Sequence, residues 1–207
     1  MHFFNFHHHF KDEYGIYNYQ ISENTEVDFF SVGIHPAEIS DDFEEKFQIL
    51  KEISKKKNCF AIGECGLDGL ISVEDSIQEE IFEKQILWAN EIQKPVIIHC
   101  VRRFSQLIRF RKMAKVPLIV HGFNKKQNIA NELLENDFYL SFGKALISNV
   151  SLQTTFKEAP IDRIFLETDN EIFNIEELYL FAADLKKLSV TDLQEQIFQN
   201  LETIKNG

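Results

Sequence analysis

The chain has 207 residues, which is enough for one large domain or two small ones. Hydrophobic residues make up 44% and charged residues 27%, close to the globular average, so a disordered or collagen-like chain is excluded. The formal net charge of -11 argues against non-specific binding to nucleic acid or to an anionic membrane, but not against an enzyme that meets phosphate through bound cations.

The cysteines and the first residues of the chain predict a cytoplasmic protein. Cys59, Cys65 and Cys100 are odd in number and form no C-x-x-C motif, which favours reduced thiols. The first ten residues lack a basic region, and histidines interrupt their apolar run, so we expect no signal peptide. No uncharged apolar run approaches the roughly 18 residues of a membrane span, and no obligate protein partner is predicted.

Short apolar runs alternate with longer amphipathic segments, the pattern of a parallel α/β fold. No linker or repeat interrupts the chain, so residues 1–207 are expected to form a single domain. The predicted strands are Phe3–Phe6, Gly15–Ile21, Phe29–Val32, Cys59–Gly63, Val96–Ile98, Leu118–Val120, Phe138–Ser141 and Ile164–Leu166.

Most of these strands are separated by predicted helices. They are Asp41–Lys55, Glu74–Ile92, Arg103–Ala114, Lys125–Glu135, Ile175–Leu188 and Thr191–Ile204, with a short one at Ser151–Pro160. Asp41 and Thr191 are the expected N-caps. In the second helix an apolar stripe is predicted to face the core; it comprises Ile77, Ile81, Phe82, Ile86, Ala89 and Ile92.

Histidine or an acid follows five of the eight predicted strands. In a closed parallel barrel these positions meet at one rim, at the carboxyl ends of the strands, where catalytic groups are found. The side chains concerned are those of His7, His9, Glu64, His99, His121, Glu167 and Asp169. Residues scattered along the chain are therefore expected to form one cluster.

The chemistry of this set indicates a metal centre. His7 and His9 lie on the same face of a strand, because side chains alternate along it, and one ion can bind both imidazoles. Four histidines with two carboxylates are too many for a closed structural zinc site and suit one or two open catalytic ions. Such ligands accept Zn, Mn or Mg, so the metal is not fixed by the sequence.

Each candidate also has a structural interpretation. Glu64 follows a glycine and could close a turn, His99 and His121 could be hydrogen-bonded core histidines, and Asp169 could cap a helix. For Glu167 two alternatives stay open: its side chain could point into the barrel wall, or it could support a metal ligand.

Three further side chains near the candidates are expected to be structural. His8 should pack on the opposite face of its strand, and Cys65 and Cys100 should point away from the rim into the core. No nucleophile triad can be argued, because the histidines are better explained as ligands, and no G-x-G-x-x-G or P-loop motif occurs.

Six sequence blocks, in order, resemble the TatD-like metal-dependent hydrolases, a branch of the amidohydrolase-type barrels. The blocks are Asn5-x-His7-x-His9, Gly33-Ile34-His35-Pro36, Gly63-Glu64-Cys65-Gly66-Leu67-Asp68, Pro95-Val96-Ile97-Ile98-His99-Cys100, Val120-His121-Gly122-Phe123 and Leu166-Glu167-Thr168-Asp169. Between the third and fourth blocks, Gln78, Phe82, Gln85 and Ala89 match the family's helix spacing.

The resemblance implies a distorted, shortened TIM (β/α)8-type barrel with one or two divalent metal ions. It implies that His7, His9 and Asp169 hold one ion, that His99 and His121 hold a second, and that Glu64 bridges or shares them. It gives His35 only as a substrate contact. The family's usual activity is hydrolysis of phosphodiesters, commonly in DNA, and Asp169 could accept the proton of the attacking water.

The chain also departs from the family's pattern. Asn5 replaces an Asp, and the Pro expected soon after Asp169 is missing. Val101 replaces an Arg, for which the following Arg102 and Arg103 could substitute. A substrate-facing loop after Asp169 is expected to be deleted. Only short connectors flank the second predicted strand, so at least one outer helix is expected to be lost.

The sequence therefore predicts a metal-dependent hydrolase acting on ester bonds, with DNA or another phosphodiester as substrate and Glu64 and Asp169 as catalytic residues. A small-molecule amidohydrolase or esterase on the same centre is the first alternative; the acidic charge, the altered arginine and the shortened loop favour it. A catalytically silent binding protein is the second. It would be expected to have lost ligands first, and all six are present.

Overall fold

The computed structural model describes residues 2–24 and 26–206. Its single sheet has eight strands, each pairing in parallel with the next along the chain. The strands are β1 (Asn5–His8), β2 (Gly15–Tyr19), β3 (Phe30–Val32), β4 (Cys59–Asp68), β5 (Val96–Val101), β6 (Leu118–Val120), β7 (Phe138–Phe142) and β8 (Ile164–Leu166).

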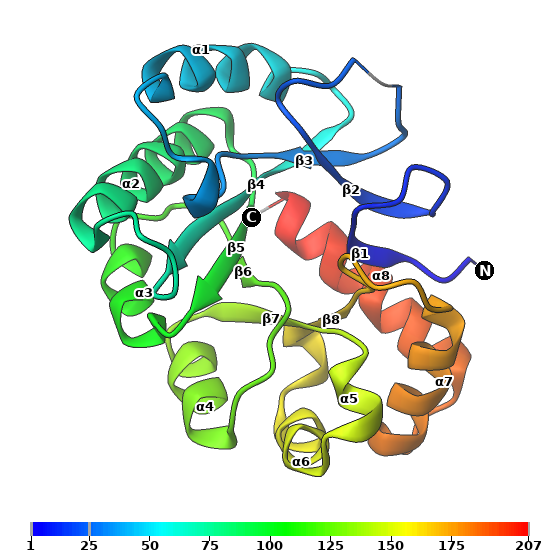
Figure 1. The fold of residues 1–207 in the computed structure, drawn as a ribbon. Coiled ribbons are helices and arrows are strands. Elements are labelled where there is room, and N and C mark those ends of the chain that lie inside the picture. Colours follow the sequence, from blue (N-terminus) through cyan, green and yellow to red (C-terminus); the bar gives the residue numbers. More distant parts are fainter. Residues whose placement is uncertain (1, 25, 207) are drawn as a thin grey trace.

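The sheet curls into a barrel whose first and last strands meet (Figure 1). Just beyond the end of β8, the backbone N–H of Asp169 donates to His7 O at 3.0 Å, and His9 N–H donates to Asp169 O at 3.2 Å. These bonds form the bridge between His8 and Asp169. The predicted distorted TIM-type barrel is thus confirmed, with a short seam between β1 and β8.

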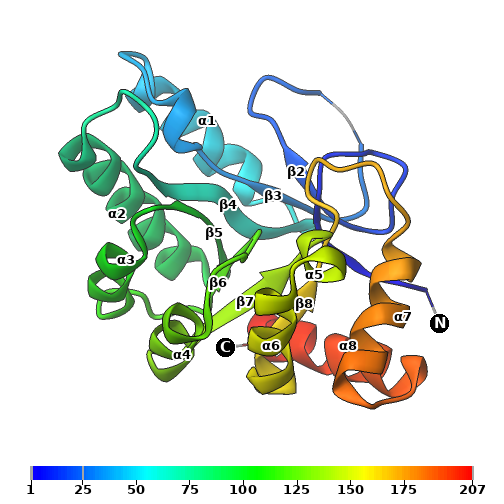
Figure 2. The ribbon, with the colours of Figure 1, turned by 60° about the horizontal axis from the view of Figure 1, so that its bottom comes forward.

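Helices surround the barrel on most of its circumference (Figure 2). They are α1 (Phe43–Ser54), α2 (Asp75–Ile92), α3 (Phe104–Arg111), α4 (Gln127–Glu135), α5 (Ala145–Ser148), α6 (Val150–Glu158), α7 (Ile175–Lys186) and α8 (Val190–Asn206), with 3-10 turns at Pro36–Glu38 and Ile161–Arg163. None of the helices in the described residues is long and apolar enough to cross a membrane.

The outer face of β2 has no helix over it in the described part of the chain, which confirms the expected loss. A small separate apolar cluster fills this place; it comprises Tyr17, Tyr19, Phe30, Val32 and Cys59, with Ile21, Val27 and Ile53 packed against it. Gly15 begins β2 beside β1, and a Cβ there would lie 1.9 Å from Asn5 O, so only glycine fits this approach.

The last helix, α8, packs at the amino-terminal ends of the strands. The ring of Phe198 meets that of Phe4 edge to face at 6.0 Å, and Asn200 Nδ2 donates to Ile164 O at 3.0 Å. This helix buries Leu193 and Ile197 against the core. The opposite, carboxyl-terminal end of the barrel is left to the strand-to-helix loops.

Several boundaries differ from those predicted. β1 lies two residues later than expected, and β4 and β5 run on through Glu64 and His99, which therefore belong to strands rather than following them. Parallel pairing of Cys65 to Asp68 with Ile98 to Val101 explains the extension, since each strand completes the other's hydrogen bonds.

The helix details also needed correction. Asp42, not Asp41, precedes α1, and the residue capping α8 is Ser189, whose Oγ accepts a hydrogen bond from Asp192 N at 3.0 Å. Ile77 was predicted to lie in the core-facing stripe of α2 but is 43% exposed. Gln78 is buried in that stripe instead. The short α5 was not predicted, because four residues carry too little periodicity to be recognised.

Candidate metal centre

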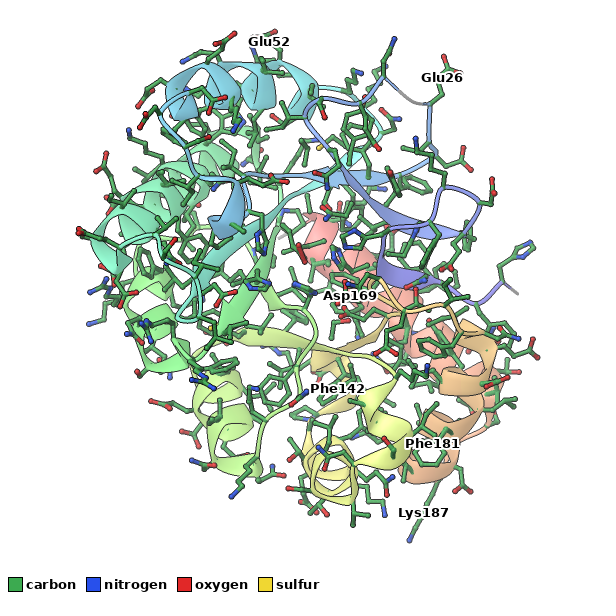
Figure 3. The ribbon with its side chains drawn as sticks, viewed as in Figure 1. Glu26, Glu52, Phe142, Asp169, Phe181 and Lys187 are labelled. Atoms are coloured by element: carbon green, nitrogen blue, oxygen red, sulfur yellow. The ribbon has the colours of Figure 1, made fainter. Side chains whose placement is uncertain are left out.

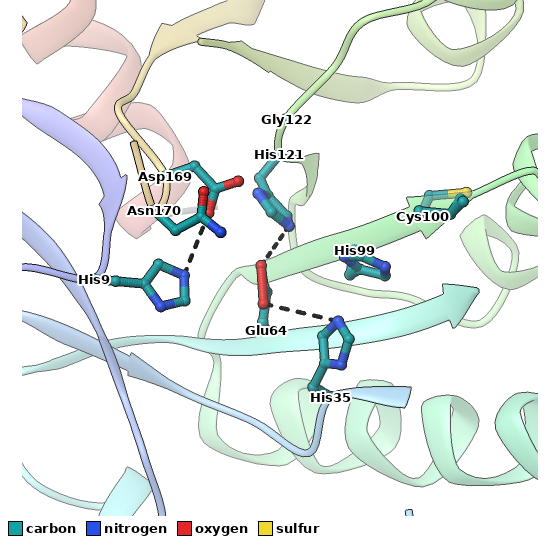
Figure 4. A pocket seen from close by; sticks show the side chains of 10 residues that line it. His9, His35, Glu64, His99, Cys100, His121, Gly122, Asp169 and Asn170 are labelled. Atoms are coloured by element: carbon teal, nitrogen blue, oxygen red, sulfur yellow. Dashed lines mark ion pairs between the residues drawn. The ribbon is translucent and has the colours of Figure 1, made fainter. Parts of the chain in front are cut away.

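The predicted rim residues meet in one cavity at the carboxyl-terminal end of the barrel. In Figure 3 the labelled Asp169 lies near the middle of the ring of strands, whereas Glu52 and Lys187 lie at the margin. The cavity has a volume of about 270 Å³. Its lining residues are His9, His35, Glu64, His99, Cys100, Val101, His121, Gly122, Asp169 and Asn170 (Figure 4).

Four side chains form the inner cluster, which comprises His7, Glu64, His121 and Asp169. One nitrogen or oxygen atom from each lies within 4.8 Å of all the others. Glu64 is central: its Oε1 lies 2.6 Å from His121 Nε2 and 3.2 Å from His7 Nε2. Asp169 Oδ1 lies 3.8 Å from His7 Nε2. One donor atom thus comes from each of β1 and β4 and from each of the segments that follow β6 and β8.

The inner cluster fits a divalent cation. Neither ring nitrogen of His7 or of His121 has a hydrogen-bond partner of normal geometry among the described residues, although both rings are buried. Buried polar atoms are rarely left without a partner in folded proteins, so such nitrogens are available to coordinate an ion. Imidazole nitrogens with carboxylate oxygens are a donor set that Zn, Mn and related ions accept.

The charges of the inner cluster compensate one another. Burial opposes ionisation of Glu64, but the close contacts and charges of His121 and His7 hold the pKa of Glu64 well below its ordinary value. Burial likewise opposes protonation of His121, but Glu64 and Glu167 hold the pKa of its ring well above the ordinary value. The opposite directions of these shifts show that the His121 ring and the Glu64 carboxylate favour each other's charged forms.

His9 lies beside the inner cluster, where the chain leaves β1. Its Nε2 is 3.3 Å from Asp169 Oδ1, and this contact outweighs burial and raises the pKa of His9. Asn18 on β2 lies near the same nitrogen, with Nδ2 at 3.5 Å from His9 Nε2. His9 thus faces the same carboxylate as His7, as the His-x-His spacing predicts.

His99 and His35 form the other side of the cavity, with ring centroids 4.3 Å apart. His99 Nε2 lies 3.1 Å from Asp68 Oδ2, and His35 Nε2 lies 4.0 Å from Glu64 Oε2. His35, Glu64 and His99 also offer ligand atoms within 4.8 Å of one another. Burial, helped by the neighbouring His99, lowers the pKa of His35 to about 4.

The structure thus brings the six predicted ligands and His35 around one cavity. His7, Glu64, His121 and Asp169 are the most tightly grouped, while His9, His35 and His99 flank them. The division of these ligands between a first and a second ion stays a prediction.

Two glutamines of α2 hold the strand ends that carry the site. Gln85 is fully buried; Ile34 N donates to its Oε1 at 2.7 Å, and its Nε2 donates to Ile34 O at 3.1 Å, next to His35. Gln78 pairs in the same way with Asp68, at 2.7 and 3.0 Å. Each amide bonds both the backbone N–H and the backbone C=O of one residue, and this holds the strand end in place.

The sequence left Glu167 undecided, and the structure places it behind His121. Glu167 is fully buried, its Oε1 lies 3.4 Å from His121 Nδ1, and the same oxygen accepts a hydrogen bond from Gly122 N at 2.6 Å. A carboxylate on the far nitrogen is the usual partner of a ligating imidazole. Asp68 stands in the same relation to His99.

Some expectations about neighbouring residues were wrong. Cys100 lines the cavity instead of lying in the core, although burial raises the pKa of its thiol to about 12. Arg103 pairs with Asp75 at 2.9 Å, and neither it nor Arg102 lines the cavity. Cys65 is buried in the core as expected. Asn18 was missed, because an isolated asparagine in a strand gives no signal.

Comparison with known protein families identifies the chain. The family model described as TatD related DNase matches residues 16–206. The chain belongs to this family. Over 152 residues it is 34% identical to the uncharacterized metal-dependent hydrolase YabD of Bacillus subtilis (strain 168), covering 70% of this chain and 60% of YabD. It is 30% identical over 147 residues to the uncharacterized metal-dependent hydrolase YcfH of Escherichia coli (strain K12), covering 68% of this chain and 55% of YcfH.

This TatD-family chain therefore matches about 55 to 60% of the length of these curated relatives. Solved structures show the same fold. The crystal structure of YjjV, a TatD homolog from Escherichia coli K12, superposes with a TM-score of 0.73 at 20% identity, over 86% of this chain and 77% of that one. A TatD-family hydrolase from Entamoeba histolytica also gives a TM-score of 0.73, at 16% identity, over 86% of this chain and 74% of that one.

Proposed function

We propose that this TatD-family chain is a divalent-metal-dependent hydrolase that cleaves phosphodiester bonds, with DNA as its first candidate substrate. The observation that carries the proposal is the inner cluster, in which His7, Glu64, His121 and Asp169 present donor atoms within 4.8 Å of one another. Two relatives are called metal-dependent hydrolases, and the family is described by a DNase activity. We further propose that residues 1–207 act as one domain in the cytoplasm.

In this proposal the ligands are those that the sequence predicted. His7, His9 and Asp169 would hold one ion, His99 and His121 would hold a second, and Glu64 would bridge or share them. When bound, a divalent ion lowers the pKa of a coordinated water toward about 7 and offsets negative charge on phosphoryl oxygens. Glu167 and Asp68 orient the imidazoles of His121 and His99 from behind.

Asp169 and Glu64 are the proposed catalytic residues. The Asp169 side chain is 35% exposed to the cavity, so one oxygen can reach a water and accept its proton. Burial opposes ionisation of Asp169, but the hydrogen bond from His9 and the charges of His121 and His7 lower its pKa, so the carboxylate is available as a base at neutral pH. Glu64 stays ionised at the centre of the cluster and fixes the positions of His7 and His121.

His35 is proposed to contact the substrate as a hydrogen-bond donor. Its Nδ1 accepts a hydrogen bond from Ala37 N at 3.1 Å, so in the neutral ring the proton must be on Nε2. That Nε2–H lies on the cavity side, 4.0 Å from Glu64 Oε2. A protonated nitrogen cannot ligate a cation, and this favours a bond to a substrate oxygen over a place among the metal ligands.

The test is hydrolysis by metal-stripped protein with Mg, Mn or Zn added back. Single-stranded DNA and a small aryl phosphodiester are the substrates, and the Glu64→Ala variant is run in parallel. We expect metal-restored cleavage of DNA that the variant lacks, because Glu64 contacts His7, His35 and His121 together.

An exposed carboxylate offers a matched control: Glu52→Ala removes an acid that pairs only with Lys55 on the surface of α1. This variant should keep full activity. Activity that survives in Glu64→Ala, or no cleavage of either phosphodiester with any of the three metals, would refute the proposal.

A second candidate function has its own support. None of the cavity's lining residues, all in the described part of the chain, is Lys or Arg, so protein cations would not contact a polyanion at the reacting centre. The net charge of -11 acts in the same direction. A small carboxylic ester or amide hydrolysed by the same ligands would fit these features. Metal-restored turnover of such a compound, with DNA left intact, would select this function.

A further inference from the structure

We propose that Glu13 is a positioning residue for the metal centre. Through Asn5 and Thr168, its carboxylate holds the end of β8 so that Asp169 faces His7 and His9. The inference rests on the proposed function, since it assigns Glu13 a role in presenting a metal ligand. Glu13 itself touches neither the cavity nor any of the proposed ligands in the described contacts.

The three side chains form a closed hydrogen-bond network at the seam of the barrel. Asn5 is fully buried; its Nδ2 donates to Glu13 Oε2 and, at 2.6 Å, to Thr168 Oγ1. Asn5 Oδ1 accepts a hydrogen bond from Thr168 N at 2.9 Å. Thr168 Oγ1 in turn donates to Glu13 Oε2 at 3.3 Å.

Glu13 is the terminal acceptor of this network. The Thr168 backbone N–H fixes Asn5 with Oδ1 toward β8, so both amide hydrogens of Nδ2 must find acceptors elsewhere. One goes to Thr168 Oγ1 and the other to Glu13, which also receives the threonine hydroxyl. Without the carboxylate, one amide N–H and one O–H at a buried position lose their acceptor, and the side chains must turn to find another.

Thr168 transmits this constraint to the next residue. Asp169 adopts φ 55°, a left-handed conformation that a non-glycine residue keeps only where its surroundings hold it. Its own N–H and C=O bond to His7 O and His9 N, at 3.0 and 3.2 Å. With Thr168 held on one side and β1 on the other, the Asp169 carboxylate lies 3.3 Å from His9 Nε2 and 3.8 Å from His7 Nε2.

Glu13 comes from the short loop between β1 and β2. Its N–H donates to Phe10 O at 3.3 Å, which closes a turn before β2 begins. The carboxylate lies next to a small cavity of about 180 Å³, separate from the metal cavity and lined in part by Asn5, Glu13 and Tyr14. Shortening the Glu13 side chain therefore enlarges a space that water can enter and creates no clash.

The test measures metal affinity directly. Mn and Zn are titrated calorimetrically into the metal-stripped wild type and the Glu13→Ala, Glu13→Gln and Asp12→Asn variants, at a temperature where each is folded. Glu13→Ala should weaken binding about tenfold, at the low end of what outer partners of metal ligands contribute. Glu13→Gln should bind close to the wild type, because the amide oxygen can accept both hydrogen bonds. Asp12→Asn removes the neighbouring, exposed charge and should change nothing.

A second variant tests the route of the effect. Thr168→Val keeps the shape of the side chain but removes its hydroxyl, and it should weaken metal binding as Glu13→Ala does. If both act through one network, the double variant should lose less affinity than the sum of the two single losses. Hydrogen exchange of the metal-free protein should show faster exchange of the Thr168 and Asp169 amides in Glu13→Ala.

The outcomes separate this inference from the proposed function. Wild-type affinity in Glu13→Ala, or a loss that Glu13→Gln shares in full, would overturn the role of Glu13 and leave the metal centre standing. A wild-type protein that binds neither Mn nor Zn, and whose cleavage Mg does not restore either, would overturn the proposed function, and the role of Glu13 with it. A tenfold loss rescued by glutamine supports both.

Discussion

Replacing Gln85 tests how far the hydrogen bonds beneath the site stabilise the fold. In Gln85→Met the side chain keeps its volume, but Ile34 N–H and Ile34 C=O lose partners at 2.7 and 3.1 Å in a fully buried position. Each unsatisfied buried group costs about 1–3 kcal/mol, so the loss of both should lower the free energy of unfolding by about 2–6 kcal/mol. Gln85→Ala should cost more, because it also leaves a cavity.

Urea unfolding followed by circular dichroism measures this change. With a slope of about 2 kcal/mol per molar urea, the midpoint of Gln85→Met should fall by about 1–3 M. Gln48→Met is the matched control, because the Gln48 side chain is exposed on α1, and its effect should stay within about 0.5 kcal/mol. A loss below about 1 kcal/mol in Gln85→Met would refute the assignment of two stabilising backbone bonds.

Three further outcomes are expected. Added Mn or Zn at about 100 times the dissociation constant should stabilise the wild type by about 2.7 kcal/mol in thermal unfolding. If the metal raised the Tm of His121→Ala as much as that of the wild type, the ligand assignment would be contradicted. Glu167→Ala should weaken metal binding at least about tenfold in calorimetry, because His121 Nδ1 and Gly122 N lose their shared carboxylate; unchanged affinity would leave Glu167 without that role. Burial lowers the pKa of Lys186 to about 8, below its unfolded value, so the unfolded chain binds more protons between these two values and stability should rise with pH across that window. NMR titration of the Lys186 ε-group checks it, and a midpoint at the ordinary lysine value would contradict the effect of burial.

The sequence predicted the barrel because its apolar runs are short and separated. Runs such as Leu118–Val120 and Ile164–Leu166 are confirmed residue for residue, since nonpolar side chains face both the barrel interior and the helices. The sequence did not predict where β4 and β5 end, because a polar residue such as Glu64 or His99 after an apolar run looks like the start of a loop. The strands extend only because β4 pairs with β5 from Cys65 and Ile98 onward.

The clustering of the candidate ligands was equally predictable, because a histidine or acid at a strand end can be recognised in the sequence. Their supports were harder to see. Asp68 and Glu167 lie next to motif residues, but which imidazole each carboxylate meets depends on how the strands are staggered around the barrel. The acceptor role of Glu13 toward Thr168 could not be read from the chain, because it depends on contact between strands at opposite ends of the sequence.

The seam between β1 and β8 also has a consequence for how the site comes into existence during synthesis. Asn5 and Thr168 are joined by hydrogen bonds although 163 positions separate them. A nascent chain that has emerged as far as β7 can already pair its strands in order, but it has no partner for the free edge of β1. The left-handed turn at Asp169 forms only when the segment after β8 pairs with the free edge of β1. The cavity and the closed barrel should therefore appear in the same late step of folding.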